Sequence, residues 1–452
     1  MGSFRLGQAG MRGEIASALI PELAINFASA LGTYLEGGTV VVGRDTRISS
    51  PLFHKAAISA LMSCGCNVID ADIISAPEIH YIVPKLKAKG GLLIGAGHHP
   101  MGWNALIPIL ENGAFFTNVK LQELLDIYHS KRYLMATWDK IGKIKLPPNN
   151  FQEEYLDMLC SKLDIKAIAA KNFMVIADFC NGAGSSIGIK FAERLGINLL
   201  PINKANSGFL PHDPEPRPRS ALQTNSVLKP LNADIGFVFN SDMSRTSIVT
   251  SSGETLSEEY TFPLVLEHVL QNSDKKLKIV TNWCTTKSLD DIAKKYDAKV
   301  FKTNVGESSI IDKMNEIDAD IAGDGSGSVA FANHIMSFDN LMVMGVILEA
   351  MAKQRCTSAE LASSIPRYNI IKKKVSCPSS HAYNAIKGFK NIFTDAEVLE
   401  EDGFLFKWKD GSVHLRSSTT EPIIRMIVEF KSKEKAEDKA IQIRGLLDRF
   451  SG

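Results

Sequence analysis

A ten-residue stretch near the C-terminus carries the hydrogen-bond donors that a phosphate group needs. It reads Arg416-Ser-Ser-Thr-Thr-Glu-Pro-Ile-Ile-Arg425, and so joins two arginines to four consecutive hydroxyl residues. Guanidinium groups, hydroxyls and turn N–H groups all bind phosphate oxygens well. The stretch alone is equally typical of a solvated turn, so a phosphate site here needs support from the rest of the chain. Its candidate residues are Arg416, Ser418, Thr420 and Arg425.

Three further loops rich in glycine and polar residues each come directly after a strand-like apolar run. They are Gly95–Asn104 (GAGHHPMGWN), Asn240–Arg245 (NSDMSR) and Gly323–Ser328 (GDGSGS). Loops at the carboxyl ends of parallel strands are where α/β proteins bind ligands. The four loops together indicate one binding site assembled from distant parts of the chain.

The elements that must hold the first three loops alternate between short apolar runs and helical stretches. Helices are predicted at Ser17–Leu35 and Pro51–Ser63. Such alternation implies parallel sheets with helices on both faces. The predicted strands are Thr39–Gly43, Asn67–Ala71, Gly91–Ala96, Phe173–Asp178, Ala233–Phe239, Lys278–Thr281, Lys299–Phe301 and Ala319–Ala322.

After about Arg367 the pattern changes. Strand-like runs at Gly403–Trp408 and Ile423–Phe430 precede one amphipathic helix, Lys433–Phe450, which is typical of a smaller α+β domain. A Pro-Pro-Asn-Asn stretch at 147–150 resembles a linker. The predicted domains are residues 1–150, 151–256, 257–366 and 367–452.

In their order and spacing, the four loops resemble those of the α-D-phosphohexomutases (phosphoglucomutase, phosphomannomutase and phosphoglucosamine mutase). The resemblance covers essentially the whole chain. It implies an α/β fold with three related α/β domains with mixed sheets, plus a smaller, flexible C-terminal α+β domain, around a central cleft. Further matching motifs are Gly7–Gly13 (GQAGMRG), Val42–Arg47 (VGRDTR), Asn181–Gly184 (NGAG), Phe209–Pro216 (FLPHDPEP) and Asn304–Gly306 (NVG).

The resemblance also implies a role for each loop. Residues 1–150 carry the nucleophile-type loop (Gly95–Asn104) and residues 151–256 the metal-type loop (Asn240–Arg245). Residues 257–366 carry the sugar-type loop (Gly323–Ser328), and residues 367–452 the phosphate loop (Arg416–Arg425). The implied ligand is a hexose phosphate or bisphosphate.

The nucleophile-type loop departs from the family at its reacting residue. Gly97 stands at the position of the family's phosphoserine and has no side chain to carry a phosphoryl group. Covalent catalysis by that route is therefore excluded. The catalytic candidates that remain beside Gly97 are His98 and Arg12. Because the family already has a histidine at the position of His98, a rerouted phosphohistidine mechanism on His98 or His99 is the weaker interpretation.

The metal-type loop also departs from the family pattern. Asn240, Asp242 and Ser244 stand where the family has three aspartates. Mg²⁺ favours carboxylate oxygens, so we predict no firm cofactor and only weak Mg²⁺ binding at Asp242. An ion pair between Asp242 and Arg245 is the simpler role for that carboxylate.

Proton transfer and sugar binding are altered as well. The family's lysine after the nucleophile-type loop is Ile107 here, and the histidine of the sugar-type loop is Ser328. Asp324 replaces a glutamate that is one methylene longer, and Ser326 remains. We keep Asp324 and Ser326 as substrate-binding candidates. The phosphate loop departs least, with Thr419 in place of a glycine.

The lost residues all serve phosphoryl transfer, whereas those that grip phosphate are retained. The sequence therefore predicts a phosphohexomutase homologue, a member of an isomerase family of carbohydrate metabolism, that binds a phosphorylated sugar without standard mutase catalysis. Such a pseudoenzyme would sense phosphosugars or assist a partner protein. The alternative is an active or low-activity mutase that moves phosphate between C1 and C6 of a hexose.

Bulk composition limits the other partners. With 452 residues and a net charge of +1, nothing favours nucleic acid or a membrane as a partner. The seven cysteines are scattered without metal spacing, and no signal-like or membrane-spanning run is present. The sequence thus predicts a cytoplasmic protein, acting as a homodimer or paired with an active mutase.

Overall fold

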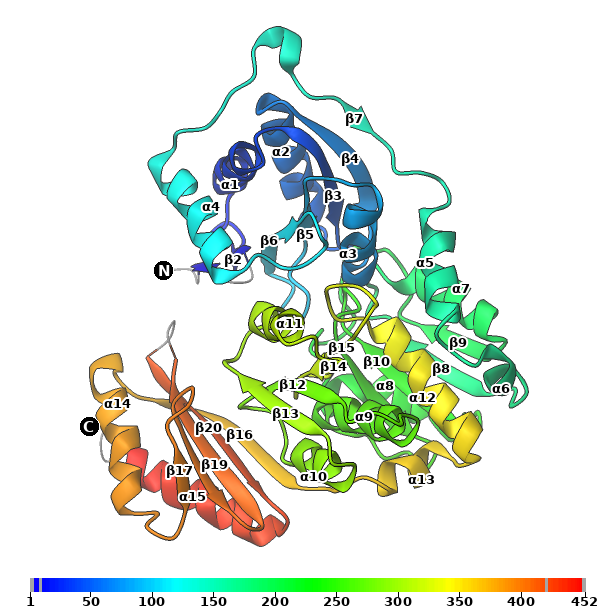
Figure 1. Ribbon diagram of the computed structural model, residues 1–452, viewed down its shortest axis with the longest axis vertical. Coiled ribbons are helices and arrows are strands. Elements are labelled where there is room, and N and C mark those ends of the chain that lie inside the picture. Colours follow the sequence, from blue (N-terminus) through cyan, green and yellow to red (C-terminus); the bar gives the residue numbers. More distant parts are fainter. Residues whose placement is uncertain (1–3, 8–9, 419–421, 449–452) are drawn as a thin grey trace.

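The computed structural model describes residues 4–7, 10–418 and 422–448. The chain folds into three α/β domains with mixed sheets and a C-terminal domain built on an antiparallel sheet (Figure 1). No helix in this described part of the chain combines the length and the apolar character needed to cross a membrane.

The first sheet has the order β1-β2-β6-β5-β3-β4-β7. Residues Val40 and Val42 of its central strand face one hydrophobic cluster, and Val41 faces another, so this strand is buried on both sides. Helices α1 (Pro21–Tyr34), α2 (Ser50–Ser63) and α4 (Asn118–Ser130) cover the first face, and α3 (Ala76–Lys85) covers the second. The strands are β1 (Phe4–Gly7), β2 (Gly10–Glu14), β3 (Gly38–Arg44), β4 (Cys66–Ile73), β5 (Gly90–Ile94), β6 (Trp103–Leu110) and β7 (Ile144–Lys145).

The second and third sheets have four strands each, in the orders β11-β10-β8-β9 and β13-β12-β14-β15. Strands and helices of the two domains share one continuous core, in which Phe179 and Phe237 of the second domain join Phe262 and Leu348 of the third. The two domains are therefore packed as one body.

The strands of these two sheets are β8 (Met174–Asp178), β9 (Asn198–Ile202), β10 (Ile235–Phe239), β11 (Thr246–Thr250), β12 (Lys278–Asn282), β13 (Lys299–Thr303), β14 (Ile321–Gly323) and β15 (Val329–Phe331). Their helices are α5 (Phe151–Cys160), α6 (Ile165–Ala169), α7 (Ser185–Leu195), α8 (Leu222–Leu228), α9 (Thr261–Gln271), α10 (Ser288–Lys295), α11 (Glu307–Glu316), α12 (Asn340–Gln354) and α13 (Ser358–Ser363).

The C-terminal domain has a fully antiparallel sheet in the order β16-β20-β19-β18-β17. Helices α14 and α15 pack on one face, where Ile386 and Ile443 meet Phe406 and Met426. The elements are β16 (Asn369–Ser376), α14 (Ser379–Gly388), β17 (Glu397–Leu399), β18 (Phe404–Trp408), β19 (Gly411–Ser417), β20 (Ile423–Phe430) and α15 (Lys433–Asp448).

The strands predicted from apolar runs are present, and β20 has the predicted bounds. Strand–helix alternation alone implied parallel sheets, but the mixed sheets that the resemblance implies are confirmed, because β6, β11 and β15 each lie antiparallel to the strand before them. Each follows one of the three site loops. A loop this short can join only antiparallel neighbours, since a parallel connection needs a crossover of a dozen or more residues. The helix predicted from Ser17 begins instead at Pro21, since proline suits the first helical turn.

Candidate functional site

The loops after β5, β10 and β14 lie against one another. The Ser241 hydroxyl donates to the carbonyl of Gly97 at 2.9 Å, which joins the metal-type loop to the nucleophile-type loop. The Ser328 hydroxyl donates to the carbonyl of Ser244, also at 2.9 Å, which joins the sugar-type loop to the metal-type loop. Three of the four predicted loops therefore form one continuous structure where the first three domains meet (Figure 1).

The Arg47 side chain holds the backbone of the nucleophile-type loop in place through hydrogen bonds. This side chain is fully buried and pairs with Asp45 at 2.9 Å. Its guanidinium donates to the carbonyls of Gly97, His99 and Pro100 at 2.9, 2.7 and 2.8 Å. Arg47 is the last residue of the Val42–Arg47 motif, and its supporting role was not predicted from the sequence. The signal that could have indicated this role is an arginine two residues after an aspartate at a strand end.

The Cα of Gly97 faces the metal-type loop in the direction that a side chain would take. Its φ of +49° lies in the left-handed region, and a Cβ added there would stand 2.5 Å from Asp242 Oδ2. The space that a seryl side chain would enter is thus next to the remaining carboxylate of the metal-type loop. This neighbourhood agrees with the roles that the resemblance implies for the two loops, but the carboxylate oxygen now fills the space.

The polar side chains of the metal-type loop satisfy one another. Asp242 Oδ1 accepts from the Ser244 N–H at 3.0 Å and from the Ser244 hydroxyl at 2.6 Å. The Asn240 amide donates to the same hydroxyl at 2.9 Å. Among the residues that the structure describes, no group of three His, Cys, Asp or Glu side chains is placed to hold a metal ion. This donor set does not fit Mg²⁺, which favours several carboxylate oxygens.

Arg245 does not pair with Asp242, so that prediction is wrong. The carboxylates within ion-pair distance of Arg245 are Glu307 at 3.3 Å and Glu215 at 3.6 Å. Burial by itself would lower the pKa of Arg245, but Glu307 and the neighbouring carboxylates raise it overall. Asp242 Oδ1 accepts from Ser244 and Oδ2 lies beside Gly97, whereas Arg245 pairs with carboxylates from α11 and from the Phe209–Pro216 motif.

Millimolar Mg²⁺ is expected to stabilise the protein by less than about 0.4 kcal/mol, the limit for a ligand below its dissociation constant. The reason is that Asp242 is the one carboxylate left among the three metal-ligand positions. Melting temperatures measured in Mg²⁺ and in a chelator test this, with Asp242→Ala as the control. A Mg²⁺-dependent rise that Asp242→Ala removes would contradict the expectation.

The histidines of the nucleophile-type loop sit in an electropositive setting. Arg12 Nη1 lies 3.1 Å from His99 Nε2, and the His99 ring stacks between those of His98 and Trp103. Burial, reinforced by Arg12, lowers the pKa of His99 to about 3, and burial with Arg245 lowers that of His98. Both imidazoles are therefore neutral near pH 7, and the arginines supply the positive charge that attracts anions.

The two sugar-binding candidates hydrogen-bond each other. Asp324 Oδ1 accepts from the Ser326 N–H at 2.9 Å and from its hydroxyl at 2.5 Å. Asp324 Oδ2 accepts from the Asn282 side chain at 3.3 Å. A sugar hydroxyl would therefore have to share this carboxylate with the loop.

The phosphate loop lies at the end of the β19–β20 hairpin, where Arg416 and Arg425 are cross-strand partners. Arg416 pairs with Asp402 at 3.2 Å, and Asp402 also accepts from the N–H of Val305 in the third domain at 3.4 Å. Ser418 is nearly buried. Thr420, with Thr419 and Glu421, lies outside the described residues.

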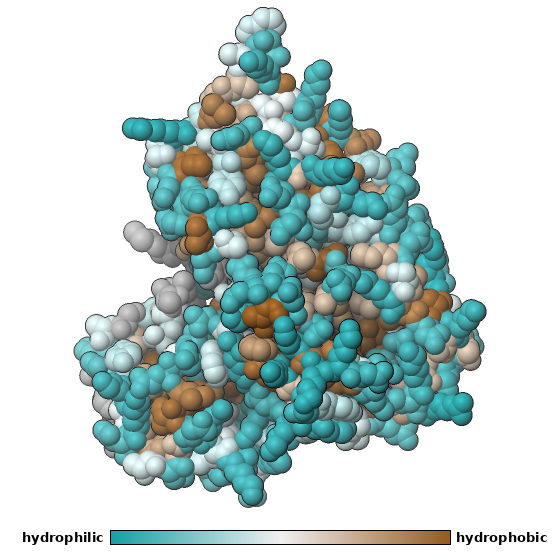
Figure 2. Space-filling view, viewed as in Figure 1, coloured by the Kyte–Doolittle hydropathy of each residue, from teal (hydrophilic) through white to brown (hydrophobic). Residues whose placement is uncertain are grey.

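Figure 2 shows the surface hollowed where the C-terminal domain faces the first domain. We refer to this feature as the interdomain hollow. The β19–β20 hairpin points toward it from one side, and the nucleophile-type loop belongs to the domain on the other (Figure 1).

Comparison with known proteins gives consistent matches along the chain. Family models described as phosphoglucomutase/phosphomannomutase alpha/beta/alpha domains I, II and III match residues 4–135, 153–253 and 257–368. A probable phosphoglucosamine mutase of Pyrococcus abyssi is 31% identical over 441 residues, covering 97% of this chain and 96% of that protein. A phosphoglucomutase/phosphomannomutase of Thermococcus kodakarensis is also 31% identical, covering 96% of each chain.

Solved structures match the fold as a whole. A phosphoglucomutase/phosphomannomutase family protein from Burkholderia thailandensis superposes with a TM-score of 0.86 at 22% identity, covering 98% of this chain and 97% of that one. A putative phosphomannomutase from Thermus thermophilus gives a TM-score of 0.84, also at 22% identity, covering 99% and 100% of the two chains.

Proposed function

The chain belongs to the phosphoglucomutase/phosphomannomutase family, and from this premise we propose that it binds a hexose phosphate or bisphosphate without the family's phosphoserine-dependent chemistry. The observation that carries the proposal is Gly97, which offers no side-chain atom to accept a phosphoryl group. The ligand would lie in the interdomain hollow, between the nucleophile-type loop and the phosphate loop.

Retained positive charge supports phosphosugar binding. Arg12 lies against His99 of the nucleophile-type loop and Arg245 ends the metal-type loop, while Arg416 and Arg425 stand on the phosphate loop. Charge-assisted hydrogen bonds from guanidinium groups are the strong contacts to a phosphate dianion. A ligand with two phosphate groups would be drawn to both sides of the hollow.

Three substitutions support the loss of standard catalysis. Gly97 removes the nucleophile, and Asn240 and Ser244 remove two of the three carboxylates that would hold the metal ion. The remaining groups of the metal-type loop hydrogen-bond one another. On this proposal the protein senses phosphosugars or assists an active mutase, as a homodimer or in a mixed pair.

A second candidate function is that of an active mutase that moves phosphate between C1 and C6 of a hexose. The names of the relatives favour it, because they read phosphoglucosamine mutase and phosphoglucomutase/phosphomannomutase. This function would need a nucleophile other than residue 97. The relatives thus favour the mutase, and the residues of the site favour binding alone.

Calorimetry with hexose phosphates and glucose 1,6-bisphosphate is expected to show binding that depends on Arg416. Loss of a charge-assisted hydrogen bond costs about 1.5–3 kcal/mol, so Arg416→Ala should weaken affinity roughly tenfold to a hundredfold. Asp402→Asn is the matched control. It keeps the shape of the ion-pair partner but frees the guanidinium, so it should bind at least as tightly as the wild type.

An activity assay on the same samples distinguishes phosphosugar binding without turnover from mutase activity. A coupled assay with glucose, mannose and glucosamine phosphates, with Mg²⁺ and bisphosphate present, is expected to show no turnover. Turnover within about a hundredfold of a typical kcat near 10 s⁻¹ would establish the mutase instead. Absence of binding at millimolar ligand would overturn the phosphosugar proposal, and the scaffold would then serve protein partners only.

A further inference from the structure

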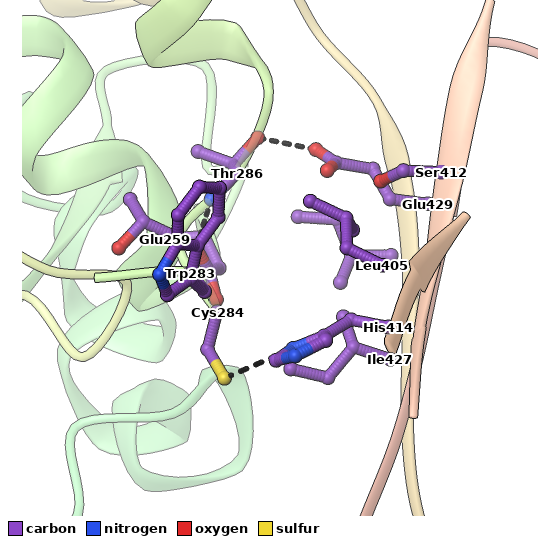
Figure 3. A pocket seen from close by; sticks show the side chains of 11 residues that line it. Glu259, Trp283, Cys284, Thr286, Leu405, Ser412, His414, Ile427 and Glu429 are labelled. Atoms are coloured by element: carbon purple, nitrogen blue, oxygen red, sulfur yellow. Dashed lines mark hydrogen bonds between the residues drawn. The ribbon is translucent and has the colours of Figure 1, made fainter. Parts of the chain in front are cut away.

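The C-terminal sheet rests on the third domain through a partly charged interface. It packs against η3 (Glu258–Tyr260) and against the α10 approach, residues 282–287, which leads from β12 into α10. Figure 3 shows the side chains that face one another there. Glu259, Trp283, Cys284 and Thr286 come from the third domain, and Leu405, Ser412, His414, Ile427 and Glu429 come from the C-terminal sheet.

Glu259 touches three separate segments from its buried position at 1% exposure. It forms an ion pair with Lys372 of β16, which reaches it from the surface of the C-terminal domain. Its Oε2 accepts from the N–H of Thr286 at 3.1 Å. The same oxygen packs on Gly325 of the sugar-type loop, where an added Cβ would come within 2.1 Å of it. One carboxylate therefore joins the C-terminal domain, the α10 approach and the sugar-type loop.

Glu429 holds the α10 approach from the other side. Its Oε1 accepts from the Thr286 hydroxyl at 2.5 Å and from the Lys287 N–H at 3.0 Å. A carboxylate at this position also complements the positive end of the helix. Glu429 lies four positions after Arg425 on β20, so the strand that carries half of the phosphate loop also binds Thr286.

The α10 approach in turn supports the sugar-type loop. The Thr285 hydroxyl oxygen accepts from the N–H of Gly325 at 3.2 Å, and the Asn282 side chain donates to Asp324 at 3.3 Å. Direct contacts therefore connect Lys372 with Asp324. Glu259 is the residue that contacts Lys372, the α10 approach and the sugar-type loop.

We propose that Glu259 is a positioning residue that couples docking of the C-terminal domain to the shape of the sugar-type loop. The C-terminal sheet, which carries Arg416 and Arg425, and the sugar-type loop then shift together, so that the two ends of a ligand are gripped jointly. The inference rests on the proposed function only in giving these loops a common ligand, and the coupling itself is a property of the ligand-free protein.

The charges at the interface agree with this role. Burial raises the pKa of Glu259 to about 7, while Lys372 opposes the rise and Glu258 and Glu429 add to it. An ionised Glu259 without Lys372 would be an uncompensated buried charge, which is costly. Its carboxylate would then shift or take up a proton, and the contacts to Thr286 and Gly325 would change with it.

Hydrogen exchange of the ligand-free full chain tests the coupling. Lys372→Met is expected to speed amide exchange roughly tenfold in residues 323–328, which Lys372 reaches through Glu259, as local opening becomes easier. Lys373→Met is the matched control, because it removes the same charge from the exposed neighbour on β16 and should leave the loop unchanged. Glu259→Gln keeps the shape of the side chain and should reproduce the effect of Lys372→Met.

The coupling should also act in reverse, because linkage between two sites is reciprocal. Gly325→Ala displaces the Glu259 carboxylate from the sugar-type loop side, so exchange in β16 should rise. Faster exchange throughout the chain, the first domain included, would indicate general destabilisation and overturn the proposal. Unchanged exchange at 323–328 in both Lys372→Met and Glu259→Gln would overturn it too. Neither outcome depends on whether a phosphosugar binds.

Discussion

Replacing Arg47 with methionine is expected to destabilise the first domain by about 3–5 kcal/mol, the range for breaking a buried ion pair from one side. Asp45 is 1% exposed and would lose its counterion. The carbonyls of Gly97, His99 and Pro100 would lose their donors at the same time. The first unfolding transition in calorimetry or in a urea titration measures the loss.

Arg44→Met provides the matched control for Arg47→Met. Arg44 also pairs with an aspartate, Asp72, but that carboxylate is 65% exposed. An ion pair so open to water contributes at most about 1 kcal/mol. If Arg47→Met cost no more than Arg44→Met, Arg47 would not be the support of the nucleophile-type loop.

The combined variant Gly97→Ser, Asn240→Asp and Ser244→Asp is expected to gain two capacities that the proposed function denies to the wild type. It should bind Mg²⁺ and take one phosphoryl group from glucose 1,6-bisphosphate, whereas the wild type takes none. The geometry supports this because a Cβ at position 97 would stand 2.5 Å from Asp242 Oδ2. Asn240 and Ser244 lie within hydrogen-bond distance of each other, so their replacements would place carboxylates beside Asp242.

The substitutions cost folding free energy, so the measurement must distinguish a destabilised protein from one that cannot accept a phosphoryl group. A serine in the left-handed region at residue 97 costs about 1–2 kcal/mol, and Asp242 must rotate to make room. Intact mass after incubation with the bisphosphate gives the readout. The same variant with Gly97→Ala in place of Gly97→Ser is the control, since it should bind metal but gain no mass. Phosphoryl uptake by the control or by the wild type would show that another residue is the nucleophile.

Several features of the molecule followed from the sequence. Apolar runs located the central strands, and β20 has the predicted bounds. The order of four loop motifs identified the family. Motif residues can be read in this way because they are local, so that their types and spacing survive without knowledge of the fold.

The antiparallel strands β6, β11 and β15 were missed for a physical reason. β15 spans only Val329–Phe331, too short for a periodic signal. β6 and β11 directly follow polar loops, and their pairing is fixed by the neighbouring strand rather than by their own composition. They matter to the site, since they hold three of the loops as short connections.

The sequence by itself determined the family, the fold class and the residue types at Gly97, Asn240 and Ser244, on which the proposed function rests. Only the tertiary structure decided which charges pair. Arg245 takes Glu307 and Glu215 rather than nearby Asp242, and Glu259 takes Lys372 from another domain. Spacing along the chain cannot select among several carboxylates, because the energy of an ion pair depends on distance and burial in the folded molecule. The folded structure fixes the distance between every pair of charges and the burial of each charge.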